Sequence, residues 1–247
     1  MEMLRRLDVR KTPLIAGLAA AAVAGQAWAT AILVFDANTV NGLAWEAAQN
    51  LAGAGAVKAG ASDFYTKLAE GGWDVVAVDC PSTIPGGGWT QLADYVNAGG
   101  LVVMAYWNWD AEPGITKAFG ASGTSGDVYW VDGSTTLTDM GTSPIFAGVS
   151  MPNSSWNNYW YDDGDKFKIA DGSVGLAQIG GSGDPVMFLG NGGHTIASSV
   201  LDEAGPKWLS DGSGVKLWEN MMMYVMPSPG ALALLGLAGF AGTRRRR

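Results

Sequence analysis

Residues 71–110 read GGWDVVAVDCPSTIPGGGWTQLADYVNAGGLVVMAYWNWD, and this stretch decides the fold. Asp74 to Asp79 is a short valine-rich run, which is typical of a strand buried on both faces. Thr90 to Ala98 has apolar residues at helical spacing, and the two glycines after it can end a helix at little cost. Leu101 to Tyr106 is a second buried run. The stretch therefore predicts a strand, a helix and a second strand, joined as a right-handed crossover in a parallel sheet.

The sequence before this stretch shows the same alternation. Ala31 to Phe35 predicts a buried strand, and Leu43 to Leu51 predicts a helix. Residues 52–61, AGAGAVKAGA, are interpreted as a flexible join, and residues 62–70 as a helix that Ser62 can cap. Strands that alternate with helices indicate a layered α/β domain.

The composition changes after Gly120, where Gly, Ser, Thr, Asp and aromatic residues become frequent. Glu112 to Phe119, just before this change, predicts a short helix with Pro113 in its first turn. Beyond it, short strands separated by turn residues are predicted at 128–131, 156–161, 166–169, 174–179, 186–189 and 195–200. Val215 to Met226 predicts the last helix. The expected fold is an α/β domain with a mainly parallel sheet and a β-rich insertion.

The amino end has the three parts of a secretory signal peptide. It begins with basic residues, continues with an apolar run from Leu14 to Ala24, and ends in a small-x-small cleavage site formed by Ala27 and Ala29. The apolar run is short for a stable membrane span. We therefore expect residues 1–29 to be removed on export, the alternative being an uncleaved anchor.

The carboxyl end combines a proline motif, a short apolar segment and a basic cluster. The proline motif is Pro227, Ser228 and Pro229, and the apolar segment is Ala231 to Gly242. Twelve apolar residues are about two thirds of the roughly 20 that a spanning helix needs, yet the basic end suits a positive-inside stop. The basic cluster consists of Arg244, Arg245, Arg246 and Arg247.

This tail, residues 227–247, resembles the PEP-CTERM sorting signal, with Ser228 where that family most often has glutamate. The resemblance implies export through the inner membrane of a Gram-negative-type envelope, transient retention there by the tail, and processing by an exosortase-type enzyme. The expected partners are therefore the secretion machinery and an exosortase, and the expected location is the cell envelope, outer surface or extracellular matrix. A plain tail anchor is the alternative.

The body, residues 30–226, is similar to the class I glutamine amidotransferase-like superfamily, especially its ThuA-like branch. The segments that carry the similarity are GWDVV at 72–76, DYVNAGG at 94–100, SPIFAG at 143–148, and Gly192-Gly193 before a late strand. The resemblance implies a flavodoxin-like sheet. The superfamily's nucleophile is not matched, because the chain has Tyr106, Trp107 and Asn108 where the strand ends, with no Ser, Cys or Thr among them. We therefore expect no catalytic triad of that family.

The charge of the body excludes nucleic acid as a partner. The formal net charge of the chain is -8, but its eight arginine and lysine residues outside the body mask a body with seven lysines, no arginine and 21 acidic residues. Such a surface repels phosphate backbones and anionic lipids. Cations, neutral glycans and proteins are the partners that it favours. The single cysteine, Cys80, excludes an internal disulfide.

Polar residues follow several predicted parallel strands. They are Asp36 and Asn38 after the first strand, Asp79 after the second, and Asn108 and Asp110 after the third. Because ligands of such sheets bind beyond the carboxyl ends of the strands, these side chains could converge on a cation or a polar ligand. The alternative is that Asp and Asn stand there because they suit turns.

The run Asp162-Asp163-Gly164-Asp165 places three carboxylates within four residues. Such a run could hold calcium, but it lacks the alternating spacing and the distal glutamate of an EF-hand loop. We therefore interpret it as a solvated hairpin turn, and we expect no metal site and no cofactor.

Aromatic residues gather in two clusters beside amides and carboxylates. Trp107 and Trp109 form one, and the other consists of Trp156, Tyr159, Trp160 and Tyr161. Exposed rings beside such groups stack on sugar faces and hydrogen-bond to hydroxyls, which predicts a glycan-facing patch that includes Trp107, Trp156, Tyr159 and Trp160. Packing of these rings in the core is the alternative.

The resulting hypothesis is an exported, exosortase-sorted envelope or matrix protein that is not an enzyme and that binds polysaccharide. Two alternatives stay open. One is a secreted hydrolase that uses the strand-end carboxylates, or Cys80 with His194, which is the only histidine. The other is a purely structural surface protein without a concave site.

Overall fold

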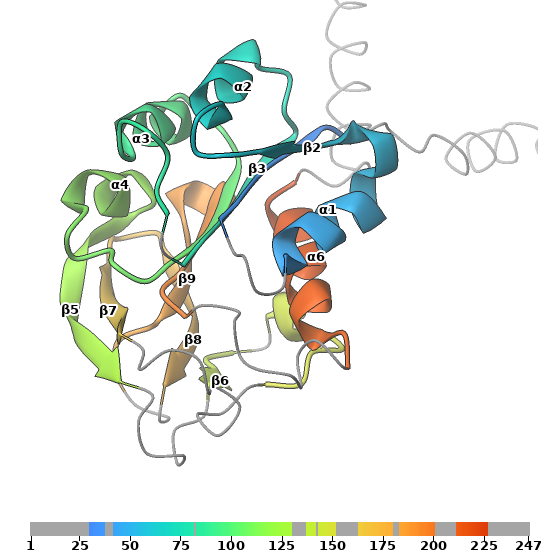
Figure 1. Cartoon of the computed structure of the whole chain (residues 1–247). Coiled ribbons are helices and arrows are strands. Elements are labelled where there is room, and N and C mark those ends of the chain that lie inside the picture. The colour runs from blue at the N-terminus through green and yellow to red at the C-terminus, as the bar shows by residue number, and fades with distance from the viewer. Residues whose placement is uncertain are drawn as a thin grey trace, which may run out of the picture.

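The computed structural model describes residues 30–37, 42–81, 83–129, 137–141, 143–151, 163–179, 183–200 and 211–226. Within these residues, the strands form an eight-stranded sheet in the order β2-β1-β3-β4-β10-β9-β8-β6 and a two-stranded sheet of β5 and β7 (Figure 1). Their bounds are β1 Ile32–Asp36, β2 Ala56–Ala59, β3 Val75–Cys80, β4 Val102–Tyr106, β5 Ala121–Tyr129, β6 Leu137–Asp139, β7 Asp163–Ile169, β8 Val174–Ile179, β9 Met187–Gly190 and β10 Thr195–Ser198.

The large sheet is parallel in one half and antiparallel in the other. Strands β2, β1, β3, β4 and β10 pair in parallel. Strands β9, β8 and β6 then extend the sheet in antiparallel pairing. The expected α/β architecture with a mostly parallel sheet is confirmed, and part of the β-rich insertion is an extension of that sheet.

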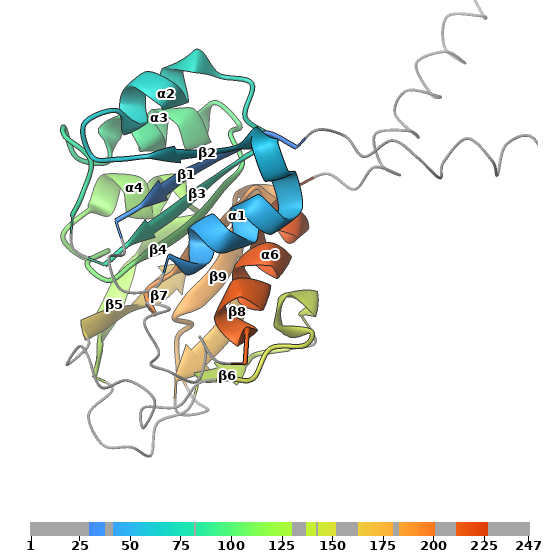
Figure 2. The same cartoon turned by 45° about the vertical axis from the view of Figure 1, so that its right-hand side comes forward.

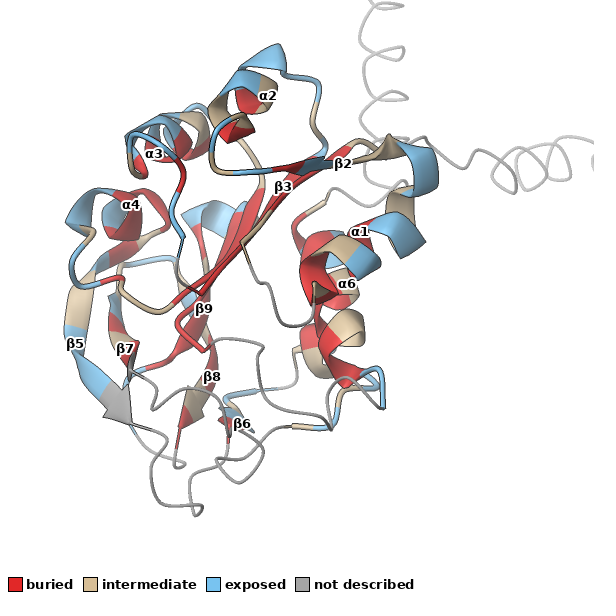
Figure 3. Ribbon diagram, in the orientation of Figure 1, coloured by how far each residue is buried: buried red, intermediate tan, exposed pale blue. Residues whose placement is uncertain are grey.

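Helices cover both faces of the sheet. Helices α1 and α6 pack on one face, and α2, α3 and α4 on the other (Figures 1 and 2). Each face therefore has its own apolar core, and the central strands β3 and β4 are buried along their whole length (Figure 3). The helix bounds are α1 Leu43–Ala52, α2 Phe64–Glu70, α3 Thr90–Asn97, α4 Pro113–Ala118 and α6 Ser213–Val225, with one-turn 3-10 helices at η1 Gly53–Gly55, η2 Pro144–Phe146 and η4 Asn191–Gly193.

Two sequence interpretations were wrong. Residues 52–61 are not a flexible join, because they contain η1 and the edge strand β2, whose Ala56 to Ala59 pair in register with β1. Asp163 to Asp165 are not a hairpin turn, because they are the first residues of β7 and pair with β5. In both cases hydrogen bonding to a distant strand outweighs a local composition of small or turn-forming residues.

The predicted signal peptide, residues 1–29, and the sorting tail, residues 227–247, lie outside the described residues. Among the helices of the described part of the chain, none combines the length and the hydrophobicity that a bilayer span requires.

Candidate functional site

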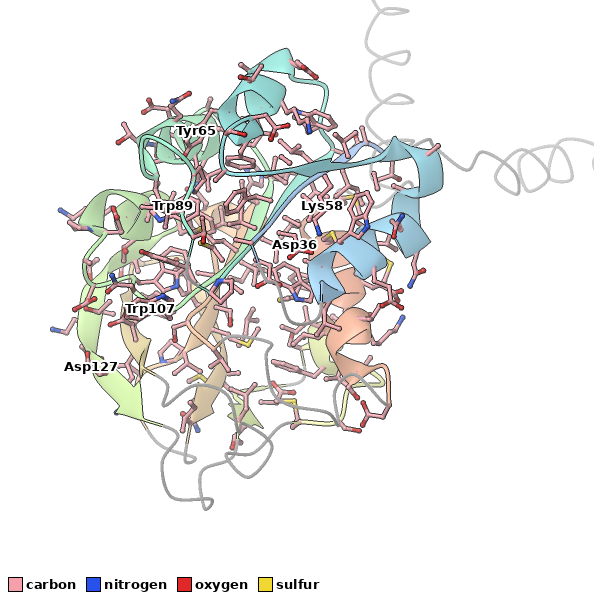
Figure 4. The ribbon with its side chains drawn as sticks, viewed as in Figure 1. Asp36, Lys58, Tyr65, Trp89, Trp107 and Asp127 are labelled. Atoms are coloured by element: carbon pink, nitrogen blue, oxygen red, sulfur yellow. The ribbon has the colours of Figure 1, made fainter. Side chains whose placement is uncertain are left out.

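The polar residues predicted to converge at the carboxyl edge of the sheet belong to two separate groups. Asp36 and Asp79 lie together at the ends of β1 and β3. Asp110 instead lies beside Asp127 and Asp165, with which it forms a group of three carboxylates among the described residues. Figure 4 shows Asp36 beside α1 and Asp127 on β5, on opposite sides of Trp107. A single cation site shared by all the strand-end acids is therefore not what the structure forms.

The first group lies where the chain leaves β1 and β3 in the middle of the parallel half. Asp36 and Asp79 are register partners, and the side chains of both are fully buried. Because Ile32 and Val34 of β1 and Val75 and Ala77 of β3 face α1 and α6, strand alternation places both carboxylates on that face. Lys58 Nζ lies 3.2 Å from Asp36 Oδ2 and supplies a positive charge.

The second group is positioned by the loop that follows β4. Trp109 is fully buried, and its indole Nε1 donates to the carbonyl oxygen of Ser198 at 3.0 Å. The hydroxyl of Thr116 in α4 donates to the carbonyl oxygen of Trp109 at 2.8 Å. These buried hydrogen bonds fix the backbone between the partly exposed Trp107 and the exposed Asp110.

Three carboxylates from three segments meet beside this loop. One oxygen each from Asp110, Asp127 and Asp165 lies within 4.8 Å of the others. Asp165 is only 3% exposed, and its Oδ2 accepts the backbone N–H of Asp110 at 3.1 Å. Burial raises the pKa of Asp165 to about 6, and the charges of Asp110 and Asp127 contribute in the same direction.

This arrangement has two chemical capacities. Oxygen ligands from three carboxylates suit a hard divalent cation such as Ca²⁺. A carboxyl group whose pKa lies near 6 can also take up and release a proton close to neutral pH. The same arrangement of three carboxylates provides both capacities, cation binding and proton transfer.

A second set of ionisable groups lies between α2, β3 and β4. Burial raises the pKa of Tyr65 and of Tyr106, and the neighbouring Cys80 and Glu112 act in the same direction on both phenols. The hydroxyl of Tyr65 donates to the carbonyl of Gly88 in the loop before α3. These tyrosines are therefore neutral at physiological pH and act as hydrogen-bonding groups, not as bases.

Cys80 and His194 do not form a catalytic pair. Cys80 is fully buried at the carboxyl end of β3, opposite Tyr106, and its thiol lies 3.3 Å from the carbonyl oxygen of Thr83. His194 is exposed and immediately precedes β10, at the amino edge of the parallel strands. The two residues thus lie at opposite edges of the sheet, roughly 15 Å apart along the strand direction.

The aromatic patch is only partly described. Trp107 is partly exposed, whereas Trp109 is buried and packs against Phe119 and Phe167 at ring-centroid distances of 5.2 and 5.4 Å. Of these two rings of the predicted patch, Trp107 is therefore the one that can face a ligand. The other predicted residues of the patch and the strand ends lie outside the described residues, namely Asn38, Trp156, Tyr159 and Trp160.

Sequence reasoning missed Asp127 and Asp165 as neighbours of Asp110. They come from β5 and β7, whose antiparallel pairing brings together residues far apart in the chain. The acidic run at 162–165 was a visible signal for Asp165, but it was assigned to a turn. Asp127 stands in a Gly- and Ser-rich segment that gave no signal of its own.

No protein-family model matches the chain, and no curated protein matches it. Solved structures of similar fold exist at low sequence identity, among them the following three. A Thermoplasma acidophilum protein whose name assigns it to GMP synthase has a TM-score of 0.51 at 13% identity, covering 79% of this chain and 94% of that one. A cytoplasmic protein from Salmonella typhimurium LT2 has a TM-score of 0.52 at 13% identity, covering 80% and 100%. A Bacteroides uniformis protein named as ThuA-like has a TM-score of 0.50 at 16% identity, covering 82% and 94%.

Identities this low show the fold alone. The likeness supports the layered α/β fold with a mainly parallel sheet that the sequence predicted.

Proposed function

We propose that the chain is an exported protein of the cell envelope or extracellular matrix, sorted by an exosortase-type enzyme, whose α/β domain binds polysaccharide and does not catalyse a reaction. The sequence of the two ends supports export and transient retention at the inner membrane. The amidotransferase-like fold without a Ser, Cys or Thr directly after β4 supports a binding role. No cofactor is part of this proposal.

The observation that carries the binding role is the position of Trp107. It is partly exposed at the carboxyl edge of the sheet, next to a loop fixed by buried hydrogen bonds of Trp109. A preorganised ring loses little conformational entropy when it stacks on a sugar. Asn108 and Asp110 follow it and offer an amide and a carboxylate to sugar hydroxyls.

A fluorescence titration with exopolysaccharide from the producing cells tests this role. The purified chain should show a saturable change in tryptophan emission, and Trp107→Ala should abolish it. Trp73→Ala is the matched control, because Trp73 is also partly exposed but precedes β3 at the amino edge. Equal binding by both variants, or no binding by the unmodified chain, would contradict a glycan site at Trp107.

A fractionation experiment tests export and sorting separately. The full chain should be recovered from the envelope or the medium, and a chain truncated after Met226 should no longer be retained at the inner membrane. A Pro227→Ala, Pro229→Ala variant should reach the membrane but escape processing. Recovery of the full chain from the cytoplasm would contradict export.

A hydrolase that uses carboxylates is the second candidate, and the raised pKa of Asp165 favours it. A hydrolase would release reducing ends or acyl groups from the polysaccharide, with an activity that Asp165→Asn removes and Asp139→Asn leaves unchanged. Binding without any released product supports the non-catalytic proposal instead.

A further inference from the structure

We propose that the last turn of α6, with Met223 and Tyr224, rests on the surface of the bilayer that holds the carboxyl-terminal tail. This inference rests on the proposed retention of the chain by residues 231–242. It assigns a membrane-facing surface to the folded body, and it sets the direction in which the candidate site points.

The exposure of this turn is the first observation. Among the described residues, five large apolar side chains are exposed: Ile84, Met140, Val174, Met223 and Tyr224. Met223 and Tyr224 are the two that are adjacent, at 44% and 41% exposure. The other side of the same turn, Met222 and Val225, is buried in the core against the sheet. The last turn of α6 is therefore apolar on its outer side as well as its inner side.

The length of the connection is the second observation. Helix α6 ends at Val225, and four residues, Pro227 to Gly230, separate Met226 from the apolar segment that begins at Ala231. Four residues span at most about 14 Å when fully extended. When the apolar segment lies in the bilayer, Met226 at the end of α6 therefore lies no farther from it than roughly this extended length. Tyrosine side chains are enriched at the interface between membrane and water, which is where Tyr224 would then lie.

The charge of α6 permits such a contact. Its only charged residues are Lys216 and Glu219, which pair with each other at 3.2 Å, so the helix carries no net charge. The body as a whole is strongly acidic and is repelled by anionic lipid. The contact should therefore be apolar and interfacial, and it should be stronger on zwitterionic than on anionic membranes.

The orientation of α6 determines what faces away from the membrane. Leu217 and Trp218 in its first half pack near Ala105 and Ser198, in the last part of β4 and β10. The helix then runs toward the amino edge of the sheet, where β1 begins (Figure 2). Trp107 and Asp110 lie at the carboxyl edge, so a body resting on the end of α6 presents them away from the bilayer.

The experiment places a reporter on the proposed contact surface of the full chain. Met223→Cys is labelled with an environment-sensitive fluorophore, and Val174→Cys, an exposed position at the start of β8, is the matched control. Cys80 is buried and does not compete for the label in the folded protein. The labelled chains are mixed with phosphatidylcholine vesicles, with and without lipids that carry a quencher at the headgroup, and recovered by flotation.

The proposal predicts that both chains float, that only the label at 223 shifts to shorter wavelength, and that quenching there exceeds quenching at 174 at least threefold. A Met223→Ser, Tyr224→Ser variant should float less than the unmodified chain, whereas Val174→Ser should not. Flotation with a label at 223 that stays in water would overturn this inference and leave the tail's membrane role intact. Absence of flotation would refute both that role and this inference.

Discussion

At the scale of single residues, the placement of Asp165 costs the folded state free energy. Its carboxyl group is buried beside Asp110 and Asp127, and its pKa rises from 3.8 to about 6. The ionised form is therefore less favourable in the folded than in the unfolded chain. The penalty is absent below pH 4, where the group is protonated in both states, and it is fully present once the pH exceeds 6.

Replacing Asp165 by asparagine should therefore stabilise the protein at pH 8. The amide keeps an oxygen that can accept the Asp110 N–H and removes the buried charge. A shift of about two pKa units corresponds to at most roughly 3 kcal/mol, and we expect a gain in the free energy of unfolding on the order of 1–2 kcal/mol. Urea unfolding of both proteins at several pH values measures the difference, which should close as the pH falls to 4.

Asp110→Asn serves as the comparison, because Asp110 is exposed and its loss relieves only part of the repulsion. It should stabilise less than Asp165→Asn at pH 8. A variant at 165 that is less stable than the unmodified protein at every pH would show that the carboxylate makes a favourable interaction that outweighs its burial.

At the scale of elements, the contact between β9 and the end of α4 leaves no room for a side chain. A Cβ built on Gly190 would lie 1.8 Å from the carbonyl oxygen of Phe119. That oxygen accepts the buried hydroxyl of Thr195 at 2.9 Å. Both partners in this contact, Gly190 and the carbonyl group of Phe119, are backbone, so they cannot move apart as a flexible side chain could.

Gly190→Ala should therefore destabilise the fold by about 2–4 kcal/mol, because it forces the strand and the helix apart and strains the Thr195 hydrogen bond. Gly114→Ala is the control within α4, since a Cβ there meets nothing within 4 Å. It should be neutral or stabilise by up to about 1 kcal/mol. Thermal and urea unfolding distinguish the two, and equal stability would contradict the close approach.

The elements that the sequence predicted well are those whose pattern is local. The valine-rich run of β3 and the apolar run of β4 identify strands buried on both faces, because no other short element needs apolar residues at every position. β2 was missed because its Ala and Lys residues and the glycines on either side have weak strand propensity, and its pairing with β1 supplies the stability. β7 was misassigned because its acidic start resembles a turn.

At the scale of the whole molecule, the group of three carboxylates could not be predicted from sequence, because it is formed by contacts between distant segments that no local pattern contains. Sequence patterns predicted Asp36, Asp79 and Asp110 at or after the ends of strands, and the structure has β1 ending at Asp36, β3 ending one residue after Asp79, and Asp110 in the loop after β4. The patterns could not show that Asp110 lies in a different group from Asp36 and Asp79. That separation follows from the pairing of β5 with β7, which brings Asp127 and Asp165 beside Asp110. Long-range pairing is set by the packing of the complete core.

The two cores on either side of the sheet share the strands β1, β3 and β4, so we expect the body to unfold as one cooperative unit. Cys80 is the natural reporter, because it is the only thiol and is fully buried on the side of α2 and α3. Its reaction with an aromatic disulfide reagent should be limited by opening of the fold.

In a cooperative body, Gly190→Ala should accelerate this reaction by the factor that its loss of stability dictates, about tenfold for each 1.4 kcal/mol. Gly190 lies on β9, outside the element that carries Cys80, so no local effect connects them. Stopped-flow absorbance with and without low urea measures the rates. An unchanged rate at Cys80 in a clearly destabilised variant would mean that the parallel half opens independently of the antiparallel extension, and that the two halves of the sheet are separate folding units.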